Sequence, residues 1–329
     1  MPIEVAVASS SAVDATSWYR SYGPLNALKL KHGISLNRLS QVTWAELGCS
    51  DVLFLQRPHA PEHIALIKLA KSIGVKVWCD YDDLLCSLTP DNPAFDYFGQ
   101  FSSNIMFAIQ NADWITVSTQ FLRDEYFKHN KNISVVPNAW NDIIHPKPFN
   151  NDKKRQTLGP RSVFWRGTDT HIKDLHDVRD EIKALSKLSA WSYMGFCPWF
   201  LRDTGQKINP LDIVTYMDFM QRTQFSVVVV PLHDSPFNRA KSNIAWIEGT
   251  VAGAVCVAPD FAEWKRPGVI NYSSSLSFSD AVEEALLRSS DGAYNAMSRA
   301  FVDENLMLSK VNFKRLEVLE KLTGKKTHE

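Results

Sequence analysis

The stretch that most constrains the fold runs from residue 225 to residue 259. Its first six residues, FSVVVV, form a short apolar run rich in β-branched side chains, which is typical of a buried parallel strand. After a polar loop, the sequence predicts a helix that begins at Ser242 as N-cap and ends at Gly253. A second buried strand is predicted over residues 254–258. This order of strand, helix and strand indicates a parallel α/β unit.

The same alternation of strands and helices extends over the rest of the chain. In the first half we predict strands over residues 3–8, 51–56, 75–79, 114–118 and 133–137, and helices from near residue 25 and over 61–72, 100–111 and 120–128. In the second half we predict strands over 162–165, 191–196 and 269–272, and helices over 210–222, 279–287 and 293–321. A Pro-rich segment at 144–160 separates the halves, so we expect two doubly wound domains, 1–143 and 161–329, joined by this linker.

Composition limits the class of protein. A chain of 329 residues is long for one hydrophobic core, and 45% hydrophobic with 22% charged residues is typical of a globular protein. The formal net charge is zero, so no overall field attracts nucleic acid or an anionic membrane. The five cysteines include no CxxC pair, which favours reduced thiols and a cytoplasmic location over disulfides or a zinc site.

Lys241 and Glu248 lie seven residues apart in the predicted helix. At about 3.6 residues per turn they share one face, roughly 10 Å apart along the axis. A cation at a helix N-terminus and an acid two turns deeper suit a ligand with phosphate at one end and sugar hydroxyls at the other.

The loop FNRAKS, the helix with Glu248 and the Gly-Ala-Val turn after it resemble the donor-binding segment of GT-B glycosyltransferases of the family 4 type. The resemblance implies two Rossmann-like domains that face a central cleft. It also implies transfer of a sugar, with retention, from a nucleotide-diphosphate sugar, expected to be a UDP-sugar, without a metal. In that family two glutamates with seven residues between them serve the donor. Glu248 matches the second, which commonly holds the ribose, and Ala240 stands at the position of the first.

The loop RGTDTHIKDL at 166–175 also resembles a stretch that contributes to diphosphate binding in this family. His171 in this loop could contact the leaving phosphate or have a structural role. Fixed cations stabilise the charge that develops on a leaving diphosphate, so Arg166 and Lys241 are also candidate catalytic residues. The expected donor-binding residues, besides Arg166, are Gly167, Thr168, Lys173, Asn238, Arg239, Lys241, Ser242 and Glu248.

Three acidic residues, Asp80, Asp82 and Asp83, follow the strand at 75–79. Ligands in open α/β sheets gather beyond the carboxyl ends of strands. The cluster could be a helix N-cap with a turn, a DxD metal site, or a binding site for sugar hydroxyls. We prefer the last interpretation, with Asp80 or Asp82 as the general base if the reaction inverts and Asp83 as an acceptor-binding residue.

The loop after the first strand borders the acceptor cleft in the resembling family, so Tyr19 and Arg20 are candidate acceptor-binding residues, although Arg20 could also be a solvated loop side chain. The acceptor could be a glycan, a lipid-linked sugar or a hydroxymethylated DNA base, since phage members of the fold modify such bases. Bases stack on aromatic side chains such as Trp18 and Tyr19, whereas the zero net charge argues against DNA.

Two other functions remain open. Ala240 in place of a glutamate allows a GT-B-shaped binding protein without catalysis. A sugar-nucleotide epimerase would share the fold and use water as acceptor. The sequence gives no indication of the oligomeric state.

Overall fold

A computed structural model describes residues 2–9, 14–38, 44–146, 149, 156–290 and 292–327. The first domain contains strands β1 (Glu4–Ala8), β2 (Ser35–Arg38), β3 (Val52–Gln56), β4 (Lys76–Tyr81), β5 (Trp114–Val117) and β6 (Ile133–Val135). Its helices are α1 (Ala15–Arg20), α2 (Tyr22–His32), α3 (Trp44–Gly48), α4 (Pro61–Ser72), α5 (Phe95–Gly99), α6 (Ser102–Asn111) and α7 (Gln120–Tyr126), with a 3₁₀ turn η1 at Leu85–Ser87.

The second domain has the same organisation. Its main strands are β8 (Ser162–Gly167), β9 (Ala190–Gly195), β10 (Gly205–Ile208), β12 (Val227–Val229), β13 (Val255–Pro259) and β14 (Val269–Tyr272), and β7 (Gln156–Thr157) pairs with β11 (Thr223–Gln224). Its helices are α8 (Ile172–Asp177), α9 (Arg179–Leu185), α10 (Ile213–Arg222), α11 (Pro236–Arg239), α12 (Ile244–Val251), α13 (Phe278–Arg288), α14 (Ala293–Asn305), α15 (Leu308–Val311) and α16 (Phe313–Thr323), with 3₁₀ turns η2 (Asp169–His171), η3 (Trp199–Thr204) and η4 (Ala262–Trp264).

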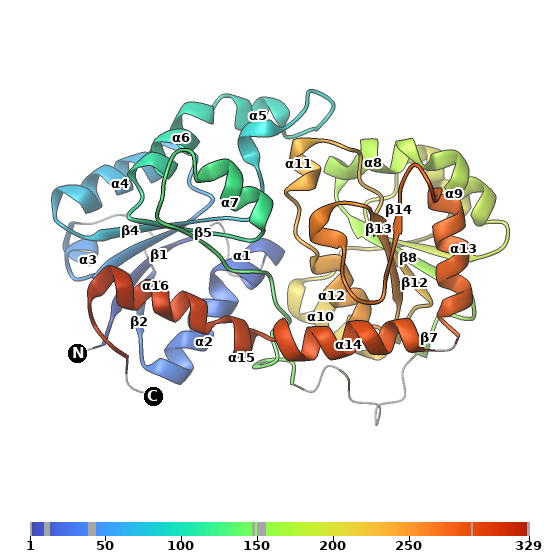
Figure 1. Ribbon diagram of the computed structural model, residues 1–329. Helices are drawn as coiled ribbons and strands as arrows, with labels where there is room; N and C mark the ends of the chain where they lie inside the picture. Colours follow the sequence, from blue (N-terminus) through green and yellow to red (C-terminus); the bar gives the residue numbers. More distant parts are fainter. Residues whose placement is uncertain are drawn as a thin grey trace.

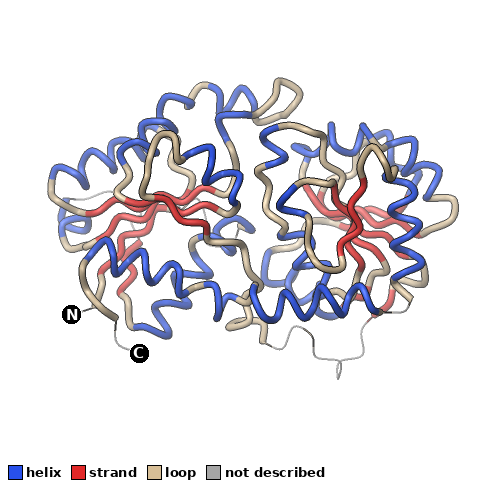
Figure 2. The backbone as a smooth tube through the Cα atoms, viewed as in Figure 1, coloured by secondary structure: helices blue, strands red, loops and turns tan. Residues whose placement is uncertain are grey.

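Each domain is built on a six-stranded parallel sheet, in the orders β2-β1-β3-β4-β5-β6 and β10-β9-β8-β12-β13-β14. The two sheets lie side by side, each between layers of helices (Figures 1 and 2). Separate hydrophobic clusters fill the two faces of each sheet. The expected α/β architecture of two Rossmann-like domains is therefore confirmed. In the second sheet the strand order reverses between β8 and β12, which is where such sheets bind ligands.

The predicted helix at 293–321 is three helices, and they carry the chain back to the first domain (Figure 1). Val318 and Leu319 of α16 pack in one cluster with Val52 and Phe54 of β3. No helix in the described part of the chain is long and apolar enough to cross a membrane.

From Ala15 onward, the described part of the loop predicted before residue 25 is largely helical, which corrects the prediction. Asp14 caps α1 by accepting a hydrogen bond from the Ser17 amide at 2.7 Å. Gly23 and Pro24 lie in the first turn of α2, where proline's fixed φ suits a helix start. A Cβ on Gly23 would lie 2.2 Å from the Trp18 carbonyl oxygen, so glycine is what lets α2 begin directly after α1.

Arg20 and Asp80 form a fully buried ion pair, with side chains that are 0% exposed. The Arg20 guanidinium donates from Nε and Nη2 to the two Asp80 oxygens at 2.9 and 2.8 Å, and Thr116 Oγ1 donates to the same carboxylate at 2.6 Å. Arg20 Nη1 donates to the Val136 carbonyl at 2.6 Å. The strand β4 continues through Asp80, so this aspartate lies inside the sheet instead of in the loop beyond it. The pair joins α1 to β4 and β5.

We expect Asp80→Asn to lower the free energy of unfolding by about 3–5 kcal/mol, because it leaves the buried Arg20 charge without its partner. Urea denaturation followed by circular dichroism measures this loss. Lys128→Met is the control: it breaks an ion pair with Glu125 whose side chains are 64% and 40% exposed, and should cost less than about 1 kcal/mol. Equal stability of Asp80→Asn and the parent protein would contradict the structural role of this pair.

Candidate functional site

A cavity of about 470 Å³ lies between the two domains. Residues from both sheets line it at or just beyond the carboxyl ends of the strands, which is the edge where doubly wound sheets bind ligands. The first domain contributes Asp14, Ala15, Thr16, Tyr19, Asp82, Asp83 and Asn138; the second contributes, among others, Trp165, Arg166, Gly167, Thr168, His171, Gly195, Tyr216, Lys241, Ser242 and Glu248.

Glu248 of α12 is the buried centre of this cavity, with a side chain 2% exposed. Arg166, at the end of β8, donates to Glu248 Oε2 from Nε and Nη2 at 2.9 and 2.6 Å. The hydroxyls of Tyr216 and Tyr19 donate to Oε2 and Oε1 at 2.8 and 2.7 Å. Tyr19 belongs to the first domain, so this carboxylate collects donors from both sides of the cavity.

The surroundings of Glu248 control the ionisation of its partners. Burial opposes the charge on Arg166, but the Glu248 carboxylate outweighs it and raises the pKa of Arg166 above its usual value. Burial and the negative charge of Glu248 raise the pKa of Tyr19 and of Tyr216, so both phenols stay protonated as donors at neutral pH.

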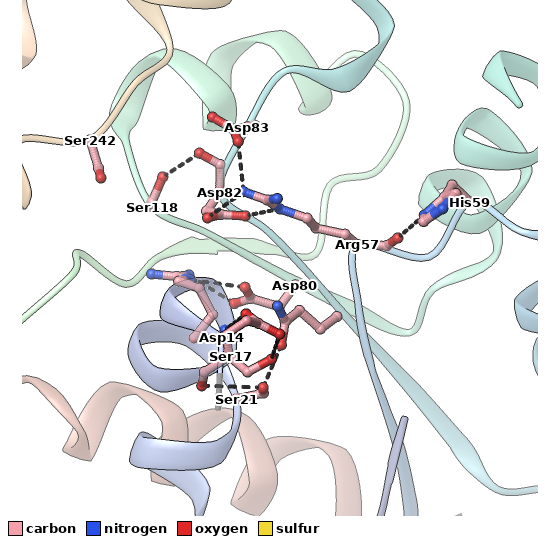
Figure 3. Close-up of polar contacts among 12 residues, drawn as sticks. Asp14, Ser17, Ser21, Arg57, His59, Asp80, Asp82, Asp83, Ser118 and Ser242 are labelled. Atoms are coloured by element: carbon pink, nitrogen blue, oxygen red, sulfur yellow. Dashed lines mark hydrogen bonds and ion pairs between the residues drawn. The ribbon is translucent and has the colours of Figure 1, made fainter. Parts of the chain in front are cut away.

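A second charged network crosses the cavity (Figure 3). Arg57 Nη2 donates to Asp82 Oδ2 at 2.8 Å and to Asp83 Oδ2 at 2.6 Å, and Arg57 Nε also donates to Asp82. Lys241 Nζ of the second domain lies 3.4 Å from Asp83 Oδ1. In Figure 3 Arg57 points toward Asp82 and Asp83, whereas Asp80 lies apart from this network and accepts other hydrogen bonds. The two domains therefore meet through the charges Asp82, Arg57, Asp83 and Lys241.

The two aspartates of this network differ in ionisation. Burial raises the pKa of Asp82 despite the nearby Arg57. Burial acts in the same direction on Asp83, but Lys241 and Arg57 together outweigh it and lower the pKa of Asp83.

The prediction that Lys241 and Glu248 share one helix face is wrong. The helix α12 begins at Ile244 with Asn243 as N-cap, so Lys241 and Ser242 precede it. The intervening turn is bound to the first domain: Thr119 Oγ1 donates to the Ala240 carbonyl at 3.0 Å, and Asn138 Nδ2 donates to Ser242 Oγ at 2.8 Å. These contacts with the other domain hold residues 240–242 outside the helix, so the helix begins later than predicted. They nevertheless bring Lys241, Ser242 and Glu248 to the same cavity.

Several predicted site residues lie elsewhere in the structure. Lys173 pairs with Asp177, and Arg239 pairs with Asp234 at 2.6 Å; both side chains are exposed, and neither is among the described residues that line the cavity. Asn238 is buried and donates from Nδ2 to Asp174 at 2.7 Å, so its contacts are with the protein. Arg20 and Asp80 are buried in the first domain, where they hydrogen-bond to each other, and neither is among the described residues that line the cavity.

Asp82, Asp83 and Tyr19 do line the cavity, with Arg166, Gly167, Thr168, Lys241, Ser242 and Glu248 opposite. Sequence reasoning missed Tyr216, Arg57 and Trp165. Tyr216 precedes the buried Met217 in α10, so the amphipathic pattern of this helix was the signal that could have placed Tyr216 on the buried face. In the sequence, Arg57 was recognisable only as the end of a strand before Pro58. In the structure it is a non-glycine residue with φ +48°. Such a left-handed conformation often marks a functional position.

No group of three or more His, Cys, Asp or Glu side chains in the described residues is arranged to hold a metal ion.

No protein-family model matches this sequence, and no match was found among curated proteins. Among solved structures, the chain is similar to an alpha-glucosyltransferase in complex with UDP-glucose and DNA containing an abasic site (12% identity, 97% of this chain and 99% of that chain, TM-score 0.65). It is also similar to HepE of Anabaena in complex with UDP and glucose (11% identity, 97% and 100%, TM-score 0.62). A third similar structure is described as a UDP-N-acetylglucosamine 2-epimerase from Listeria monocytogenes (13% identity, 100% and 99%, TM-score 0.59). These likenesses show the GT-B fold.

We expect Gly195→Ala to destabilise the protein by about 1–3 kcal/mol, because Gly195 has φ +86° and an added Cβ would lie 2.6 Å from the Gly167 carbonyl oxygen. Thermal and urea denaturation measure the effect. Gly48→Ala is the control, since nothing lies within 4 Å of its added Cβ and its φ is not positive. If the two variants proved equally stable, Gly195 would not be required for the close approach of β8 and β9.

Proposed function

We propose that this protein is a glycosyltransferase that moves a sugar from a nucleotide-diphosphate sugar, expected to be a UDP-sugar, to an acceptor hydroxyl. The observation that carries the proposal is the buried Glu248, bound by Arg166 in a cavity between two Rossmann-like sheets. A cavity of about 470 Å³ is within the usual range for small-molecule sites. The GT-B fold and its structural neighbours with bound UDP and glucose support the same assignment.

On the donor side, a ribose hydroxyl would donate to Glu248 Oε1 in place of the Tyr19 hydroxyl, because the four hydrogen bonds that Glu248 already accepts fill the roughly four acceptor positions of a carboxylate. Gly167 lets the backbone approach the diphosphate, with Thr168 and Ser242 beside it. Arg166 and Lys241 stabilise the negative charge that grows on the diphosphate when its bond to the anomeric carbon breaks. Both cations already line the cavity and need no rearrangement to reach it.

On the acceptor side, Tyr19, Asp82 and Asp83 line the cavity from the first domain. Hydrogen bonds from acceptor hydroxyls to Asp83 would replace its weak contact with Lys241, which frees Lys241 for the diphosphate. Retention of configuration follows from the family resemblance. In an inverting reaction Asp82 is the general base, because burial raises its pKa and it faces the cavity, whereas Asp80 is already saturated by Arg20 and Thr116.

Lys241→Ala and Glu248→Ala are each expected to weaken binding of UDP about 10- to 100-fold, since each removes a charged partner worth about 1.5–3 kcal/mol. Isothermal titration calorimetry measures the affinity. Lys173→Ala and Arg239→Ala are the matched controls: both remove a cation that the sequence nominated but that points away from the cavity, and both should bind UDP like the parent. Unchanged affinity in Lys241→Ala and Glu248→Ala would remove these residues from the site.

The alternative of an epimerase is supported by the similarity to the Listeria structure, and Ala240 supports a binding protein without catalysis. Incubation with a panel of nucleotide-sugars, followed by NMR, separates the three functions. We expect slow hydrolysis that releases the sugar with its ring configuration otherwise unchanged. A 2-epimer as product would establish the epimerase, and thermal stabilisation by a donor without turnover would establish the binding protein.

The acceptor class needs its own experiment, because one similar structure contains DNA. Labelled donor is offered with hydroxymethylated duplex DNA, with plain duplex DNA and with a mixture of oligosaccharides. Transfer to the hydroxymethylated duplex alone identifies a DNA acceptor. Since the zero net charge disfavours tight DNA binding, we expect label on the oligosaccharides and none on either duplex.

A further inference from the structure

His171 stands at the cavity with a carboxylate behind it. Its Nδ1 lies 2.7 Å from Asp174 Oδ2, and the imidazole is one of the groups that line the cavity. Nδ1 carries the hydrogen when the imidazole is neutral, because a buried carboxylate beside it is an acceptor. The ring orientation and the tautomer are therefore both set by Asp174.

Asp174 is itself held in place from two directions. Its Oδ1 accepts hydrogen bonds from Asn238 Nδ2 and from the His233 amide, each at 2.7 Å. The aspartate is 4% exposed and lies on α8, while His233 lies between β12 and α11 and Asn238 lies within α11. Asn238 thus acts through Asp174 and His171 instead of contacting a ligand. A histidine that is fixed by a carboxylate, which is itself fixed by two donors, is suited to carry a proton at a defined position.

The opposite edge of the imidazole adjoins the expected diphosphate site. A Cβ on Gly167 would lie 3.1 Å from His171 Cδ2, so this edge borders the residue whose backbone faces the diphosphate. His171 Nε2 has no hydrogen-bond partner among the residues that the structure describes, and the ring packs edge-on against Trp165 with centroids 6.3 Å apart. The nitrogen that is free is the one next to the site.

We propose that His171, positioned by Asp174, takes up a proton from solvent when a nucleoside diphosphate-sugar binds and donates an Nε2–H hydrogen bond to a phosphate oxygen. The inference rests on the proposed function, because it needs a diphosphate in this cavity. It assigns the third cation of the donor site, beside Arg166 and Lys241. It also makes donor affinity depend on pH in a way that the permanently charged Arg166 cannot.

The direction of the pH dependence follows from the charges around the imidazole. Burial first, and also Lys241 and Arg166, lower the pKa of His171 despite its bond to Asp174. Asp83 is the other charged group that interacts with it. A bound diphosphate adds negative charge and raises the pKa of His171. Binding is therefore tighter at low pH, and it weakens as the pH rises through the pKa that His171 has in the complex. The total loss of affinity is tenfold for each unit by which the diphosphate raises the pKa of His171.

The test measures binding of UDP-glucose by calorimetry from pH 5.5 to 8.5, in pairs of buffers with different heats of ionisation. This probe lacks the terminal phosphate whose second ionisation, near pH 6, would confuse the result. The parent protein should bind more weakly at high pH and take up a proton from the buffer. His171→Gln keeps a neutral donor near the position of Nε2, so it should bind with an affinity that is independent of pH and without proton uptake.

Two further variants complete the design. Asp174→Asn removes the carboxylate that favours the protonated ring, so its pH dependence should shift to lower pH. His233→Gln is the matched control, since that histidine pairs with Asp177 outside the cavity and its backbone contact to Asp174 remains; it should behave like the parent.

The outcomes separate the inference from the function on which it rests. If His171→Gln retains the pH dependence and proton uptake of the parent, the inference is overturned while the donor site stands. If UDP-glucose fails to bind the parent protein at every pH, the proposed function fails for this donor, and the inference fails with it.

Discussion

The structure depends on the way in which a single buried carboxylate is neutralised. A charge with an exposure of 2% is costly unless it is paired and fully hydrogen-bonded, and Glu248 meets this condition through Arg166, Tyr216 and Tyr19. Because Tyr19 comes from the other domain, satisfying this one acid also fixes how closely the two domains approach. The proposed donor site and the contact between the two domains therefore depend on the same side chain.

The four charges of the network of Asp82, Arg57, Asp83 and Lys241 alternate in sign, and Lys241 is the member that comes from the second domain. Arg57 stands between Asp82 and Asp83, and Lys241 then faces Asp83. Lys241 is thus partly neutralised by Asp83. In the proposed donor complex the negative charges of the diphosphate would replace Asp83 as the partner of Lys241, so this cation is paired both before and after the exchange.

The sequence predicted the fold better than it predicted the site. The apolar runs that form β1, β3, β12 and β13 could be recognised in the sequence because a parallel strand buried on both faces leaves a local pattern. Whether a polar residue faces the cavity depends on partners that are distant in the sequence. Asp80 pairs with Arg20, 60 positions away in the chain, and Asn238 donates a hydrogen bond to Asp174, 64 positions away. Neither pairing has a local signature. The cluster of three aspartates therefore divided into one structural and two cavity-facing residues for reasons that only the tertiary structure supplies.

The return of the chain along α14 to α16 determines what kinds of movement the molecule allows. Where the chain passes back, the Trp140 amide donates to the Leu306 carbonyl at 2.9 Å and the Leu308 amide donates to the Trp140 carbonyl at 2.8 Å. The outgoing and returning connections are thus joined by a single parallel bridge at Trp140 and Met307. Two backbone hydrogen bonds fix the register of the two connections, so any movement of one domain against the other has to bend the chain at this crossing or break these bonds.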